Sequence, residues 1–236
     1  MKPLLPIASL LLGLAPCSLI NLSASSVPDV VINAKPAVVK IIAVDANQKP
    51  CKTSTGFFIT HDGVLVTNDH VIEGAADLFA QTSTGAIYIF RSVIFRSVNL
   101  DLALLKFAAT GVPYLKLGSS VHVAEGQRII VIGRPEGLEA TVSDGIISAF
   151  LNNRSSMEIT AAISPGSGGA PVLDESGQVI GIANSIFKEG RDLNCAIAAE
   201  TLKMAFLAEA EQPANNQSQE PDPIVKFPSD DFRAPK

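Results

Sequence analysis

Short apolar runs recur along the middle of the chain. They are rich in Val, Ile and Phe and are separated by Gly, Pro, Asp and Asn, a pattern typical of β-strands and turns. Strands are predicted at residues 37–44, 55–60, 64–67, 78–82, 86–95, 102–107, 128–133, 139–147, 157–163, 178–183 and 192–197. Many short strands with this punctuation favour an antiparallel barrel or sandwich.

Two helical segments flank the predicted strands. Residues 27–36 show a helical spacing of apolar positions, and we expect that helix to end at Pro36, because proline disrupts the backbone hydrogen bonds of a helix. Residues 200–211 place Leu202, Phe206 and Leu207 at helical spacing, typical of a helix that packs on the outside of a domain.

The two ends of the chain differ from the middle. Lys2 precedes a short apolar run at 4–20 and a set of small residues at 23–25, so residues 1–26 are predicted to be a signal peptide rather than a stable membrane span. We therefore expect an exported protein, periplasmic or secreted, with one folded domain at 27–211. Residues 212–236 lose hydrophobic periodicity and are predicted to be a disordered tail.

Composition excludes some classes of function. The 236-residue chain is 47% hydrophobic and 17% charged, as in a globular domain, and its net charge is −5. No basic cluster is present, so nucleic acid is not an expected partner. The three histidines show no metal-ligand spacing with the two cysteines of the mature chain, and no metal or cofactor is expected. Those cysteines, Cys51 and Cys195, could pair in an exported protein or remain free thiols.

Three positions carry candidate chemistry. His70 follows a predicted strand, Asp101 opens an apolar strand, and Ser167 lies in a glycine-rich loop at 164–171. Each alone has an ordinary interpretation: a structural histidine, a turn aspartate and a flexible loop. Together, in this order, they match the base, the orienting carboxylate and the nucleophile of acyl transfer.

Several segments resemble trypsin-like serine proteases, and in particular the bacterial high-temperature-requirement type. They are Gly-Phe-Phe-Ile-Thr at 56–60, Thr-Asn-Asp-His-Val-Ile at 67–72, Asp-Leu-Ala-Leu-Leu at 101–105 and Gln-Val-Ile-Gly-Ile at 178–182, with further likeness at 35–41 and 193–197. The resemblance covers about residues 27–207. It does not extend to the PDZ domain that many of these proteases carry, and we expect none in this chain.

The resemblance implies two six-stranded antiparallel β-barrels with the site between them, and polypeptide as the substrate or ligand. It implies that His70 is the general base and that Asp101 orients it. The segment containing Ala183, Asn184 and Ser185 corresponds to the strand that pairs with the substrate backbone and lines the specificity pocket.

The serine loop departs from the pattern of the family, which is Pro-Gly-x-Ser-Gly-Gly-Pro. Here residues 165–171 read Pro-Gly-Ser-Gly-Gly-Ala-Pro, so aligning both prolines puts Gly168 at the nucleophile's position. The oxyanion hole of these enzymes uses the N–H of the nucleophile and the N–H two residues earlier. In a register with Ser167 as nucleophile, the second donor would be Pro165, which has no N–H. With residue 168 in that position, Gly166 and Gly168 supply both donors.

Two functions of different class stay open. The first is an exported serine endopeptidase that uses His70, Asp101 and Ser167, with the amides of Gly166 and Gly168 as the oxyanion hole. The second is a pseudoprotease that keeps the cleft for binding a peptide or protein without cleaving it.

Overall fold

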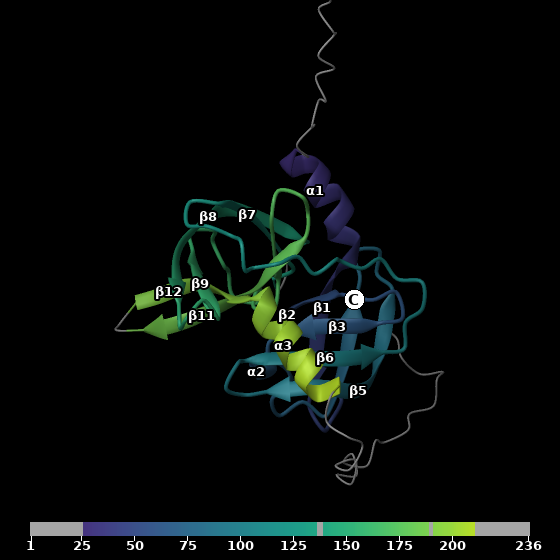
Figure 1. Ribbon diagram of the computed structural model, residues 1–236. Helices are drawn as coiled ribbons and strands as arrows, with labels where there is room; N and C mark the ends of the chain where they lie inside the picture. The colour runs from purple at the N-terminus through teal and green to yellow at the C-terminus, as the bar shows by residue number, and fades with distance from the viewer. Residues whose placement is uncertain (1–25, 136–138, 189–190, 211–236) are drawn as a thin grey trace, which may run out of the picture.

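Two closed β-barrels lie side by side in the computed structural model, which describes residues 26–135, 139–188 and 191–210 (Figure 1). Each barrel has six antiparallel strands, and one helix lies near each end of the described chain. This confirms the prediction of an all-β, trypsin-like architecture with two six-stranded barrels.

The first barrel is built from the N-terminal half of the domain. Its strands are β1 (Val38–Val44), β2 (Pro50–Phe58), β3 (Val64–Thr67), β4 (Asp77–Gln81), β5 (Ile87–Ser97) and β6 (Leu102–Phe107). They close in the order β1-β2-β3-β6-β5-β4. The β3–β6 pair matters for function, because Thr67 lies opposite Ala103 and so brings the ends of these two strands together.

The second barrel follows in the chain. Its strands are β7 (Arg128–Gly133), β8 (Thr141–Leu151), β9 (Ser156–Ile159), β10 (Pro171–Leu173), β11 (Val179–Lys188) and β12 (Arg191–Ala198). They close in the order β10-β11-β12-β9-β8-β7.

Within the described part of the chain, three α-helices accompany the barrels. They are α1 (Val27–Ala34), α2 (Asp69–Ile72) and α3 (Ala199–Ala210), and the 3-10 helix η1 (Lys35–Ala37) follows α1. Ser26 caps α1 in a reciprocal capping box with Asp29. Helix α3 contacts β11 and β12 of the second barrel and β5 of the first. Within the described ranges, no helix is long and apolar enough to cross a membrane.

One hydrophobic cluster joins the two barrels. It contains Val30 of α1 and Leu202 of α3 together with buried side chains from both barrels, such as Leu104 of β6 and Ile132 of β7. The two helices therefore pack on a core that both barrels share, which fixes the position of the groove between them. Burial of such side chains stabilises the fold by about 25 cal/mol per Å² of apolar surface.

Several predicted boundaries differ from the observed ones. The turn predicted between the first two strands is shorter, because β2 begins at Pro50, and the strand predicted to reach residue 163 ends at Ile159 in β9. Strand β10 and helix α2 were not predicted, since three or four residues are too few to show a period. Pro36 lies inside η1, two residues after the end of α1, and there it needs no helical N–H.

The loop between β9 and β10 is fastened to the first barrel. Thr55 of β2 donates its side-chain hydroxyl to the Gly166 carbonyl at 2.8 Å and its backbone N–H to the Gly168 carbonyl at 3.1 Å. Ser54 donates its hydroxyl to the same Gly168 carbonyl at 2.9 Å. Gly169 has a φ of +80°, and a Cβ there would collide with the Thr55 carbonyl and lie 2.5 Å from the Thr67 hydroxyl. Only glycine fits at position 169 in this contact between the serine loop and β2, which we call the seam.

Gly169→Ala is therefore expected to destabilise the domain by more than about 3 kcal/mol, through positive-φ strain and a backbone collision together. Gly85→Ala is the matched control, because Gly85 has a φ of +87° and no atom lies within 4 Å of the place that a Cβ would take. It should cost about 1 kcal/mol. Urea unfolding of both variants measures the difference, and equal losses would contradict the proposed steric role of the seam.

Candidate active site

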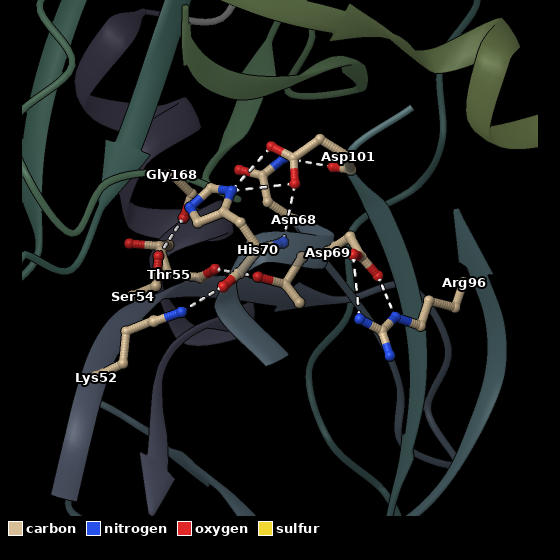
Figure 2. Close-up of polar contacts among 10 residues, drawn as sticks. Lys52, Ser54, Thr55, Asn68, Asp69, His70, Arg96, Asp101 and Gly168 are labelled. Carbon is tan, nitrogen blue, oxygen red and sulfur yellow. Dashed lines mark hydrogen bonds and ion pairs between the residues drawn. The ribbon is translucent and has the colours of Figure 1, made fainter. Parts of the chain in front are cut away.

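The His70 and Asp101 side chains meet because of the β3–β6 pairing. His70 lies in α2, which begins two residues after β3 ends, and Asp101 immediately precedes β6. His70 Nδ1 lies 2.8 Å from Asp101 Oδ2 and 3.0 Å from Oδ1, and the His70 backbone N–H donates to Oδ1 at 2.9 Å (Figure 2). Since Nδ1 faces the carboxylate, it carries the proton, and Nε2 is left as the free ring nitrogen.

The Asp101 carboxylate is held in its charged form. Burial raises the pKa of Asp101, but hydrogen bonds from the His70 ring and backbone, the charge of His70 and a side-chain hydrogen bond from Asn184 together bring the pKa below its ordinary value of 3.8. The backbone of Asp101 adopts a left-handed φ of +49°, a conformation that Asp tolerates better than most residues.

Two neighbouring residues hold this pair in place. Asn68 donates its side-chain N–H to the Asp101 carbonyl at 2.9 Å. Asp69, which is almost fully buried, pairs with Arg96 of β5 through two hydrogen bonds (Figure 2). No local pattern in the sequence predicts this ion pair, because its partners lie 27 positions apart; its one sign is the charged residue directly before His70.

Ser167 lies apart from the His70–Asp101 pair. The residue is 4% exposed, and its Oγ faces Gly133 at the end of β7, where a Cβ on Gly133 would lie 2.6 Å from Oγ. The Ser167 N–H donates to the Ser164 carbonyl at 2.8 Å, and its carbonyl accepts from Ala170 at 3.1 Å. Within the part of the chain that the structure describes, no hydrogen bond joins Ser167 to His70.

Gly168 lies where a side chain would face the free nitrogen of His70. A Cβ built on Gly168 would lie 3.6 Å from His70 Nε2 and 3.2 Å from Asn68 Oδ1. That Asn68 oxygen is buried and has no hydrogen-bond partner. Its assignment as oxygen is supported by the bond that the amide nitrogen makes to Asp101. The position therefore offers one base and one unpaired acceptor, and glycine supplies no hydroxyl to either.

The loop also carries two backbone donors without acceptors. The carbonyls of Gly166 and Gly168 accept hydrogen bonds from β2, whereas neither N–H donates to any group among the described residues. Both glycines are partly exposed and line the cleft between the barrels. Unpaired amides are uncommon in folded proteins unless water or a ligand accepts from them.

The strand β11 borders the other side of the site. Ala183 is buried, and its backbone exchanges two hydrogen bonds with the serine loop, to Gly169 at 2.9 Å and to Ala170 at 2.8 Å. Asn184 lines the cleft and also bonds to Asp101. Ser185 follows in β11, where its backbone pairs with Asn194. Asn184 therefore contacts the histidine's partner as well as the cleft.

A cleft of about 470 Å³ joins these groups. Its lining residues include Lys52, His70, Gly166, Gly168 and Asn184. No group of three metal-ligating side chains occurs among residues 26–135, 139–188 and 191–210. The two cysteines of the sequence-predicted mature chain are free thiols in different barrels: Cys51 is exposed on β2 and Cys195 is buried on β12.

Comparison with known proteins agrees with this fold and site. The trypsin-like peptidase domain matches residues 54–182, more than half of the chain, so the chain belongs to this family. It is 38% identical over 145 residues to a DegP-like periplasmic serine endoprotease of Chlamydia pneumoniae, covering 58% of this chain and 30% of that protein. It is 35% identical over 161 residues to the serine protease HhoB of Synechocystis, covering 63% and 38% respectively.

Solved structures of similar proteins indicate the same family. The HtrA-type protease AlgW with a tripeptide superposes with a TM-score of 0.70 at 28% identity, covering 79% of this chain and 64% of that one. A serine endoprotease from Yersinia pestis gives 0.70 at 25% identity, covering 80% and 68%. The predicted likeness to the bacterial high-temperature-requirement (HtrA) type is thereby confirmed. The chain spans about a third of the length of the two curated relatives.

The depressed pKa of Asp101 makes its contribution to stability pH-dependent. Because the folded-state pKa lies below the unfolded value, the stabilisation is complete above that unfolded value and is lost as the pH falls through the folded pKa. Asp101→Asn should lower the free energy of unfolding by about 1–3 kcal/mol at pH 7, as expected for hydrogen bonds to a charged group. The loss should shrink steadily below pH 4.

Urea unfolding of the wild type and the variant at pH 7 and at pH 3 checks this expectation. Asp144→Asn is the control, since Asp144 is an exposed carboxylate in a surface pair with Arg128, and its removal should change stability by less than about 0.5 kcal/mol. A loss for Asp101→Asn that is the same at both pH values would show that the charge of Asp101 does not stabilise the fold.

Proposed function

We propose that this trypsin-like domain is an exported pseudoprotease whose cleft binds polypeptide without cleaving it. The observation that carries the proposal is that His70 Nε2 faces position 168, and the residue at this position is glycine. A base without a nucleophile cannot form an acyl-enzyme. Removing the nucleophile of a serine protease lowers kcat by about 10⁶-fold.

The seam between the serine loop and β2 supports this assignment. To bring its hydroxyl to His70, Ser167 would have to leave its buried position beside Gly133. That movement would disturb the hydrogen bonds that hold the carbonyls on either side of it to Ser54 and Thr55. Each such bond contributes about 1 kcal/mol, so the rearrangement works against several interactions at once.

Binding of polypeptide is supported by what remains of the site. The cleft has a volume of about 470 Å³, and two unpaired amides and Asn184 line it. These are groups that a peptide backbone can use, since it carries both donors and acceptors. Two of the similar solved structures are of AlgW with a tripeptide and with a decapeptide.

A second candidate function is peptide hydrolysis with Ser167 as nucleophile. The intact contact between His70 and Asp101, at 2.8 Å, favours it, because a binding cleft has no need of an oriented base. In this alternative the glycines on both sides of Ser167 allow the loop to turn its hydroxyl toward Nε2 when substrate binds.

Gly168→Ser should create a reactive serine. The φ of Gly168 lies outside the left-handed region, and the nearest atom to the new Cβ, Asn68 Oδ1, lies 3.2 Å away, so small adjustments accommodate the side chain. We expect a fluorophosphonate probe to label this variant at residue 168, with the hydroxyl proton passing to His70 and fluoride leaving. Labelling should fall at least 100-fold when His70→Ala is added, since a general base contributes about 10²–10⁴-fold.

The wild type and Ser167→Ala, each shown to be folded, are the matched controls, and neither should be labelled. Peptide mapping by mass spectrometry identifies any modified serine. Labelling of wild-type protein at Ser167, lost in Ser167→Ala and in His70→Ala, would overturn the pseudoprotease proposal in favour of the second candidate.

Export is also part of the proposal, with residues 1–26 as the signal peptide and 27–211 as the protease-like domain. The DegP-like relative is named as periplasmic, which supports it. Expressed from its full gene in a Gram-negative host, the protein should appear in the periplasmic fraction with a new N-terminus near residue 27. N-terminal sequencing tests this, and a cytoplasmic protein that retains Met1 would contradict it.

A further inference from the structure

Among the residues that the structure describes, the charged side chains that line the cleft are both potential cations. They are Lys52 of β2 and His70 of α2, and no described Asp or Glu lines the cleft. Lys52 Nζ donates to the backbone carbonyl of His70 at 2.6 Å, so its positive charge lies next to the backbone of α2 (Figure 2). The carboxylate of Asp101 contacts the opposite nitrogen of the His70 ring. The electrostatic character of the cleft therefore favours an anion.

The absence of a side chain at position 168 leaves space next to the His70 ring. A Cβ there would lie 3.5 Å from His70 Cε1 and 3.6 Å from Nε2, both within ordinary contact distance. With glycine, an incoming oxygen atom can occupy this space and approach Nε2 directly. Gly166 and Gly168, whose N–H groups donate to no acceptor among the described residues, line the same cleft.

From these groups we infer that the cleft binds the C-terminal carboxylate of a peptide. This inference rests on the proposed function, because it requires a peptide that is held and not cleaved. One carboxylate oxygen accepts from the amides of Gly166 and Gly168, and the other accepts from His70 Nε2, which donates once the ring has taken up a proton from solvent together with the ligand. Lys52 adds attraction from the adjacent strand. No covalent bond forms or breaks.

A chain terminus satisfies this set of donors better than an internal peptide bond does. An internal carbonyl is neutral and offers one oxygen, whereas the terminal carboxylate offers two oxygens and a full negative charge. Hydrogen bonds to an ionised acceptor are about twice as strong as those between neutral groups. The ligand class that fits is thus a peptide that already ends in the cleft, such as the product of another protease.

The test uses pairs of fluorescein-labelled peptides on mature wild-type protein. Each pair comes from a degenerate pentapeptide pool that is synthesised once with a free C-terminal carboxylate and once with a carboxamide. Fluorescence anisotropy at low ionic strength should give about ten-fold tighter binding to the carboxylate pool, the ratio that 1.4 kcal/mol produces.

Two variants locate the effect in the cleft. Lys52→Met should weaken binding of the carboxylate pool several-fold and leave the carboxamide pool unchanged. Gly168→Ala should remove the preference, because its methyl group fills the space beside Nε2. Lys116→Met is the matched control: Lys116 is exposed, lines a separate pocket with Tyr114 and Gln178, and should not alter the ratio.

The outcomes separate this inference from the proposed function. Equal binding of both pools by the wild type would overturn carboxylate recognition and leave the pseudoprotease proposal intact. Cleavage of the peptides, detected by mass spectrometry, would overturn both. A preference that survives Gly168→Ala and Lys52→Met would also overturn the inference, because the carboxylate would then bind elsewhere.

Discussion

The seam between β2 and the serine loop is the constraint on which the site depends. Ser54 and Thr55 bind the carbonyls of Gly166 and Gly168, and Gly169 fits against Thr55 only because it has no side chain. These contacts join a strand of the first barrel to a loop of the second. They therefore determine both how the barrels meet and which residue of the loop faces His70.

The register of the loop, which places Gly168 opposite His70, determines which chemical groups meet in the site. The first barrel supplies an oriented base, because the β3–β6 pairing brings His70 to Asp101. The second barrel supplies free amides and, at the position nearest the base, Gly168. In this register no hydroxyl of the loop faces His70, and the amides of Gly166 and Gly168 donate to no acceptor among the described residues. Our proposal of binding without turnover rests on these two features.

Much of the fold could be predicted from the sequence, because strongly apolar strands such as β6 and β7 show their character locally. The family likeness followed from motifs around His70 and Asp101. Strand β10 has three residues, too few for a period, and the Asp69–Arg96 pair joins residues 27 positions apart. The direction of the Ser167 hydroxyl depends on its packing against Gly133, a contact that no local pattern encodes.

The most direct test of the central claim is a crystal structure of the mature protein, determined alone and with a bound peptide. The account predicts that Ser167 Oγ remains beside Gly133 in both states and that nothing but ligand or solvent occupies the space between Gly168 and His70 Nε2. A peptide complex in which Ser167 Oγ lies within about 3 Å of His70 Nε2 would contradict it, because that is the distance a general base requires.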